Sequence, residues 1–280
     1  MSRTTFAAWF FALFFPFTAP WVSAVEAGLR LYALDCGTLE LEDMALFEDT
    51  DAYAGVPGKM AVPCFLVRHP QGDLIWDTGL GDRLAGQGAV AMAPGITGRV
   101  PVTLRDQLQR LELAPADIEF VSFSHLHVDH TGNAPLFTDS TFLFSRAGRD
   151  WALGEPTPFG VDPSALDVPE GAALRQLDLD FDVFGDGSVR ILRAPGHTPG
   201  HRVLMLQLPA ADTVILSGDL YHTRENFRHA RIPAINTSRA ETLASFERIS
   251  KLIEKHSARF VIQHAPDDFA ALPEFPAYLD

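Results

Sequence analysis

The sequence predicts an α/β layered fold in a single domain. Short apolar stretches that are typical of strands alternate with segments whose apolar residues recur at helical spacing. Of the 280 residues 47% are hydrophobic and 21% are charged, which is enough apolar material for a sizeable core and excludes a disordered chain. Because no internal repeat or low-complexity linker interrupts this alternation, we expect one layered unit.

Strands are predicted, in chain order, at 29–34, 64–68, 74–76, 118–123, 141–144, 189–192, 203–208, 214–216 and 259–263. Each is a short, mainly apolar run. Two further segments are predicted to be loops. Residues 49–61 are rich in Asp, Gly and Ala, and residues 84–99 are rich in Gly and Ala and apolar in character.

Two helices are predicted from apolar spacing. Leu104, Leu108 and Leu111 indicate a short amphipathic helix. Ser238 and Glu241 form a capping box that begins a longer one, which ends near 255–256. The residues expected on the apolar face of the longer helix are Leu243, Phe246, Ile249 and Ile253.

The first 24 residues are expected to be a secretory signal peptide. Arg3 is the only charge in this segment, Phe6 to Phe17 is an apolar run of twelve residues, and Val22-Ser23-Ala24 supplies small residues where a signal peptidase cleaves. The alternative is an uncleaved membrane anchor, but the run is shorter than the ~20 residues that span a bilayer. Cleavage would leave a domain of residues 25–280 that is periplasmic or secreted.

Export would place the two cysteines in an oxidising compartment. Cys36 and Cys64 could therefore form a disulfide. The preferred interpretation from sequence is two small buried thiols beside strands, because pairing requires Cα atoms within about 7 Å. Two cysteines in 280 residues in any case exclude a disulfide-rich scaffold and a thiolate zinc finger.

The charge balance excludes two classes of partner. The 22 basic and 36 acidic residues give a formal net charge of −14, with no cluster of Lys and Arg. Nucleic acids and anionic membrane surfaces both require concentrated positive charge. We therefore expect a small-molecule substrate. The sequence leaves the oligomeric state open, with a homodimer as one option.

Four potential metal ligands follow one predicted strand directly, in the stretch Ser124-His-Leu-His-Val-Asp-His130. If the backbone stays extended, His125, His127 and Asp129 point the same way, whereas His130 turns elsewhere. A pair of imidazoles could then serve one metal ion, and an Asp with a His could serve another. The alternative, a solvated polar loop, is disfavoured because unpaired His and Asp after a buried strand are costly.

Three more elements place polar residues at strand ends. His197 begins His-Thr-Pro-Gly-His201, Asp219 follows Gly218, and His264 ends the last strand. His197 is the candidate ligand, whereas His201 is expected to be hydrogen-bonded in or near the core. Strand ends are where α/β sheets place their sites.

The ordered set of HxHxDH at 125–130, HTPGH at 197–201, Gly218-Asp219 and a late His264 resembles the metal-binding series of the metallo-β-lactamase fold hydrolases. The resemblance implies an αββα sandwich with two metal ions, usually zinc, at one edge of the sheets. It assigns His125, His127 and His197 to one metal, Asp129, His130 and His264 to the other, and Asp219 to both.

Within this superfamily, Thr223 to Phe227 after the aspartate is similar to the N-acyl-homoserine lactone lactonases, which are quorum-quenching enzymes. The stretches 31–37 and 75–79 are similar as well. One departure concerns the substrate: those lactonases place a tyrosine three residues after the bridging aspartate, where this chain has His222 and carries Tyr221 one residue earlier. In a second departure, Ala265 follows the late histidine, where the family usually has Asp.

The resemblance implies hydrolysis of a lactone or related ester. Two metal ions about 3.5–4 Å apart lower the pKa of a shared water, so that a bridging hydroxide can attack the carbonyl near neutral pH. Asp129 is expected to carry the proton to the leaving oxygen. His222 or Tyr221 could donate to the carbonyl oxygen, with ordinary packing as the alternative for both. Asp77 is expected to orient a ligand histidine or to cap a turn.

Other functions within the same fold remain as alternatives. An exported organophosphate or ester hydrolase would share the two-metal site. A glyoxalase II-type thioesterase is disfavoured because no Lys or Arg follows His264, and a β-lactamase because such enzymes generally lack the bridging Asp219. A metal-bound but inactive binding module is disfavoured by the intact ligand set.

Overall fold

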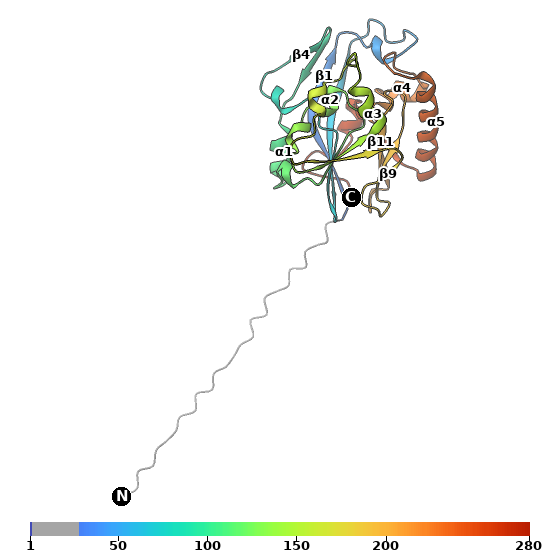
Figure 1. The fold of residues 1–280 in the computed structure, drawn as a ribbon. Coiled ribbons are helices and arrows are strands. Elements are labelled where there is room, and N and C mark those ends of the chain that lie inside the picture. Colours follow the sequence, from blue (N-terminus) through green and yellow to red (C-terminus); the bar gives the residue numbers. More distant parts are fainter. Residues whose placement is uncertain (2–27) are drawn as a thin grey trace.

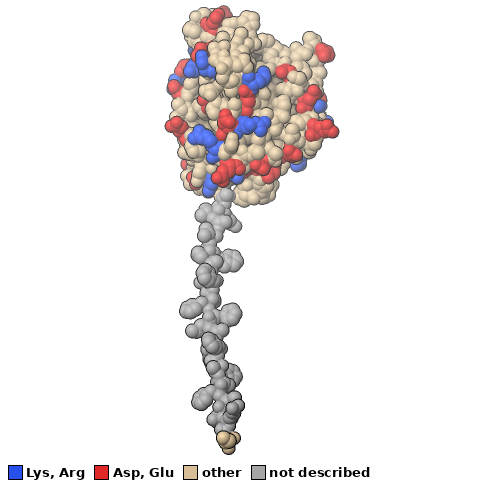
Figure 2. Space-filling model, turned by 90° about the vertical axis from the view of Figure 1, so that its left-hand side faces the viewer, with Lys and Arg blue, Asp and Glu red and all other residues tan. Residues whose placement is uncertain are grey.

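We describe Met1 and residues 28–280 of a computed structural model (Figure 1). The predicted signal peptide and its cleavage site lie outside these residues. Two mixed sheets pack against each other and carry helices on their outer faces, which confirms the predicted αββα sandwich. None of the helices in the described part is both long and apolar enough to cross a membrane. On the face drawn in Figure 2, Lys and Arg are interspersed with Asp and Glu.

The larger sheet has eight strands in the spatial order β4 (Val90–Ala93), β5 (Ile96–Arg99), β1 (Arg30–Leu41), β2 (Gly58–His69), β3 (Gly72–Trp76), β6 (Phe120–Ser122), β7 (Thr141–Ser145) and β8 (Ala173–Leu177). The smaller sheet has five strands in the order β13 (Arg259–Val261), β12 (Thr213–Leu216), β11 (Arg202–Gln207), β10 (Val189–Arg193) and β9 (Phe181–Asp182). Strands β3, β6, β7 and β8 run parallel, as do β12 and β13, so their carboxyl ends meet at one edge.

Alternation of side chains along the strands divides the core into layers. On β2, Phe65 and Val67 face the smaller sheet and belong to the cluster between the sheets. Cys64 and Leu66 face outward and belong to the cluster that α1 (Leu104–Arg110) covers. Such a strand is buried on both faces, so nearly all of its successive residues are apolar and it appears in the sequence as a continuous apolar run.

The helices cover the outer faces. The predicted helices are found as α1 and as α5 (Arg239–His256), which lie on opposite sides of the sheets (Figure 1). The side chain of Ser238 accepts a hydrogen bond from the backbone N–H of Glu241 at 3.2 Å, as the capping box predicted. The described residues form four further α-helices: α2 (Val128–Thr131), α3 (Arg146–Ala152), α4 (Arg224–His229) and α6 (Pro266–Ala270).

Three predictions about local structure are wrong. Residues 84–99 are not a loop, because β4 and β5 form a hairpin whose second strand pairs with the end of β1. Strand β2 begins at Gly58, inside the predicted loop 49–61. Leu243 is 42% exposed, so the apolar face of α5 begins one turn later at Phe246. Strand pairing is a tertiary contact, and local composition carries little information about it.

Cys36 and Cys64 form a disulfide, so the interpretation preferred from the sequence, two buried free thiols, is wrong. Cys36 and Cys64 lie on the paired strands β1 and β2 with Cα atoms 5.7 Å apart, and a disulfide links them. Gly79, which has a φ of +68°, packs directly on this bond: a Cβ there would lie 2.3 Å from Cβ of Cys36 and 3.2 Å from Sγ of Cys64. The loop that follows β3 therefore packs directly on the disulfide.

Candidate metal centre

The predicted ligands come together where strands end at one edge of the sandwich. His125 and His127 follow β6, and His197 follows β10. Asp219 lies in the 3-10 turn Gly218–Leu220 after β12, and His264 follows β13. The stretch after β6 is not extended throughout, because α2 begins at Val128. Asp129 therefore groups with His130 and His264, and not with His125 and His127.

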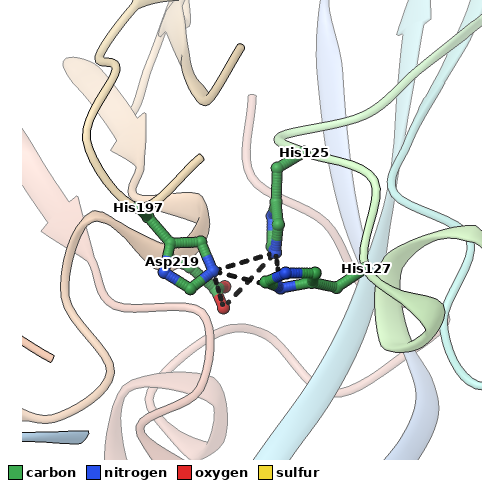
Figure 3. Close-up of side chains that lie close together, drawn as sticks. All are labelled: His125, His127, His197 and Asp219. Carbon is green, nitrogen blue, oxygen red and sulfur yellow. Dashed lines mark hydrogen bonds and ion pairs between the residues drawn. The ribbon is translucent and has the colours of Figure 1, made fainter. Parts of the chain in front are cut away.

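The first group consists of three imidazoles around one carboxylate oxygen (Figure 3). Nε2 of His125 lies 2.8 Å from Nδ1 of His127, and Nε2 of His197 lies 3.2 and 3.1 Å from these two atoms. Oδ2 of Asp219 lies 3.6 Å from Nε2 of His125 and 3.4 Å from Nε2 of His197.

The second group lies on the other side of the same carboxylate. Oδ1 of Asp219 lies 3.2 Å from Nε2 of His130 and 3.0 Å from Nε2 of His264. Oδ2 of Asp129 lies 3.6 Å from each of these nitrogens. Asp219 thus presents one oxygen to each group, which is the geometry of a bridging ligand.

Two of the histidines are held in place through the ring nitrogen that faces away from the centre. Nδ1 of His197 contacts Oδ1 of Asn236 at 2.8 Å, and Nδ1 of His264 contacts the carbonyl oxygen of Ala61 at 2.7 Å. An Nδ1–H that donates outward leaves the lone pair of Nε2 directed inward. The sequence analysis did not anticipate Asn236, because a single Asn in a loop carries no signal of this contact.

Asp77 orients His130, as predicted. Its Oδ2 lies 3.0 Å from Nδ1 of His130, and its Oδ1 accepts a hydrogen bond from the backbone N–H of Ser124 at 2.7 Å. Gln263 also donates to Oδ2 of Asp77 at 2.9 Å and accepts from the backbone N–H of Gly218. Gln263 therefore ties together the ends of β3, β12 and β13, another role that the sequence did not reveal.

The two groups differ in their electrostatics. Burial lowers the pKa of both His127 and His197 to about 3, so these rings are neutral and can act as ligands. Burial also opposes the charged forms of His130 and Asp219. At His130, neighbouring carboxylates, Asp219 foremost, outweigh burial and hold the pKa well above its usual range. At Asp219, neighbouring histidines, His264 foremost, outweigh burial and hold the pKa well below its usual range.

These contacts fit bound cations better than hydrogen bonds. Nitrogen ligands at about 2.0–2.1 Å from a tetrahedral ion lie roughly 3.3 Å from one another, close to the spacing in the first group. Oδ1 of Asp219 is buried and makes no hydrogen bond within the described residues, although two imidazole nitrogens are near it. A divalent cation in each group would satisfy these atoms.

The structure separates the two candidates for contact with the substrate. His222 is 1% exposed, and its Nε2 lies 3.0 Å from Oδ2 of Asp219. Tyr221 does not reach the centre, because its ring stacks on Phe246 of α5 with centroids 4.1 Å apart. A catalytic role for Tyr221 is therefore wrong, and the packing alternative holds for it. His201 is buried as expected, and its Nε2 accepts from the backbone N–H of Asp219 at 2.9 Å.

A cavity of about 320 Å³ opens onto the centre. Its polar wall is made by His127, Asp129, Asp219, His222 and His264. Its apolar wall consists of Leu39, Phe47, Met60, Leu80, Met92, Ala93, Ile96, Val128, Phe159, Val161 and Ile235. The β4–β5 hairpin contributes three of these residues, so the apolar segment 84–99 lines the cavity.

A family model, that of the metallo-beta-lactamase superfamily, matches residues 57–255. The chain belongs to this superfamily. The match and the ligand geometry make it a metal-dependent hydrolase, and His264 lies beyond the matched residues.

Curated relatives match over nearly their whole length. An N-acyl homoserine lactonase AttM from Azorhizobium caulinodans is 30% identical over 274 residues, which is 90% of this chain and 99% of the relative. The N-acyl homoserine lactonase AiiA of Bacillus thuringiensis subsp. kurstaki is 23% identical over 89% of this chain and 98% of its own length.

Solved structures share the fold. An N-acyl homoserine lactone hydrolase with the product N-hexanoyl-L-homoserine at its catalytic metal centre superposes with a TM-score of 0.77 at 23% identity, covering 89% of this chain and 98% of that chain. AidC, a dizinc quorum-quenching lactonase, gives a TM-score of 0.67 at 20% identity, covering 89% of each chain.

Proposed function

We propose that this protein opens the lactone ring of N-acyl-homoserine lactones by hydrolysis. The observation that carries the proposal is a complete double ligand set joined by Asp219, in a chain that matches an N-acyl homoserine lactonase over 90% of its own length and 99% of the relative's. An organophosphate hydrolase or a thioesterase of the same fold would use the same two-metal site, so the choice between these functions and lactone hydrolysis rests on this match and on the cavity.

The centre is proposed to hold two zinc ions. His125, His127 and His197 bind one, Asp129, His130 and His264 bind the other, and Asp219 bridges them. Seven protein ligands are too many for a single tetrahedral ion that keeps an open position. Imidazole and carboxylate ligands both suit zinc, although other divalent metals also accept them.

When bound, the two ions would lower the pKa of a shared water toward neutrality and polarise the substrate carbonyl. The residues of the chain supply the remaining steps. Asp129, whose side chain is 16% exposed, is reachable from the cavity and takes the proton of the attacking water on a carboxylate oxygen. The same oxygen returns the proton to the ring oxygen as the C–O bond breaks. Asp77 and Asn236 keep the histidine rings in one orientation during these steps.

The apolar wall of the cavity is proposed to take the acyl chain. Met92 and Ile96 of the hairpin line a space of about 320 Å³ together with Phe159 and Ile235 from other segments. An apolar wall with a few convergent polar groups is typical of small-molecule sites. The formal net charge of −14 also disfavours anionic substrates such as glutathione thioesters.

Residues 1–24 are proposed to direct export to the periplasm or the medium, after which the domain of residues 25–280 has no membrane attachment. The disulfide between Cys36 and Cys64 supports this proposal, because such bonds persist in oxidising compartments. Intact-mass measurement of the exported protein should give a chain that begins within a few residues of Val25. A full-length chain retained in the membrane would contradict it.

A substrate panel tests the activity. Zinc-loaded protein should release protons from N-hexanoyl-homoserine lactone, measured with a pH indicator, faster than it cleaves a β-lactam, a glutathione thioester or a phosphotriester. His197→Ala is the matched control, because it removes one ligand of the first group and should abolish turnover. Cleavage of a phosphotriester with lactones left intact would replace this proposal by the organophosphate alternative, and turnover of no ester with both metals bound would favour a binding module.

A further inference from the structure

His222 is one of the two positions at which this chain departs from the pattern of the lactonases it resembles. Its ring packs against two other rings. The centroid of Phe47 lies 4.7 Å away, and the ring of His264 lies almost parallel to it, at 7° and 5.7 Å. The ring belongs to the polar wall of the cavity but is only 1% exposed.

The contact with Asp219 fixes which nitrogen of His222 carries the proton. Nε2 lies 3.0 Å from Oδ2 of Asp219, and an ionised carboxylate can only accept a hydrogen bond. Nε2 must therefore be the donor. Nδ1 is buried and makes no hydrogen bond with any described residue, so it presents no second donor to the cavity.

We propose that His222 is a positioning residue that fixes the bridging carboxylate of Asp219, and that it does not donate to the substrate carbonyl. Its N–H holds Oδ2 toward the first group, and the rigid carboxylate then directs Oδ1 toward His130 and His264. The backbone N–H of Asp219 is held by His201 at the same time. Both ends of the bridging residue are thus anchored by an imidazole.

In this role His222 would not supply a hydrogen-bond donor to the carbonyl oxygen of the substrate. A tyrosine hydroxyl at this position could donate to a carbonyl oxygen, whereas His222 has no free donor. Stabilisation of the developing negative charge is then left to the metal ions. The inference rests on the proposed function only through the assignment of Asp219 as a metal ligand.

Metal affinity distinguishes the two roles. In His222→Gln the side-chain amide nitrogen reaches about as far as Nε2 and can still donate to Asp219, whereas in His222→Asn it falls short. Zn²⁺ affinity is measured by competition with a chromophoric chelator, and ions per chain by elemental analysis. We expect His222→Asn to bind Zn²⁺ about 10–100-fold more weakly, the scale for loss of an outer hydrogen bond to a ligand, and His222→Gln to stay within about threefold of the wild type.

Wild-type Zn²⁺ affinity in His222→Asn, together with a fall in kcat on N-hexanoyl-homoserine lactone, would overturn the inference and restore the role of a substrate donor. Equal loss of Zn²⁺ in both variants would also overturn it, because simple packing would then explain the effect. The Zn²⁺ measurements need no substrate. A wild-type protein inactive on lactones would therefore refute the proposed function without affecting this test.

Discussion

The disulfide should make a large contribution to stability, and its size can be worked out from the chain. Cys36 and Cys64 are 28 residues apart. A cross-link that closes a loop of this length lowers the entropy of the unfolded chain by about 12 cal/mol/K, which corresponds to about 3.6 kcal/mol at 25 °C. Marginal stabilities of about 5–15 kcal/mol are usual for a domain, so the loss should be plain in a denaturation curve.

The perturbation is the double substitution Cys36→Ala with Cys64→Ala. Urea unfolding of metal-free protein, followed by fluorescence, should give a free energy of unfolding about 3–4 kcal/mol below that of the oxidised wild type. Wild-type protein unfolded in the presence of a thiol reductant is the matched control, because it loses the cross-link but keeps both sulfur atoms. Agreement between the two within about 1 kcal/mol would assign the loss to the cross-link.

A consequence at the metal centre should accompany the loss of stability. The loop that rests on the disulfide at Gly79 also carries Asp77, which orients His130. The double variant should therefore release metal from the second group faster, measured by transfer to a chelator. Two free thiols in the denatured, oxidised wild type, or a stability loss below about 1 kcal/mol, would refute this reasoning.

Three further predictions concern the centre. Asp219→Asn should leave a folded protein with about one ion per chain by elemental analysis, because it keeps the size of the bridging side chain and removes its charge; two tightly bound ions would contradict the bridging assignment. Tyr221→Phe should change kcat by less than about twofold in the lactone assay, because the ring packs on α5; a loss of 10²-fold, the scale for one oxyanion donor, would show that it reaches the substrate. Acidification should release the second metal first: the pKa of His130 is held well above its usual range, so protons compete with the metal there at a higher pH than at His197, whose pKa is about 3. Dialysis at pH 8, 6 and 5 followed by elemental analysis would show this order, and simultaneous loss of both ions would contradict it.

The sequence by itself determined the features that depend on neighbouring residues. The capping box and apolar spacing of α5 are local, and they predicted its bounds. The polar residues directly after apolar strands were visible for the same reason. Parallel strands align their carboxyl ends, so motifs far apart in the chain could be expected at one edge of the sheets.

Only the tertiary structure decided which of these residues touch. The hairpin at 84–99 depends on pairing with β1, and the disulfide depends on the register between β1 and β2. The strongest case is the adjacent pair Tyr221 and His222. The backbone at Tyr221 is extended, with φ −140° and ψ 139°, so successive side chains point to opposite sides. The ring of Tyr221 therefore enters the core beneath α5, and the ring of His222 reaches Asp219. Spacing along the chain could not show which of the two reaches the metal centre, because the direction of each side chain is set by how the turn packs between the two layers.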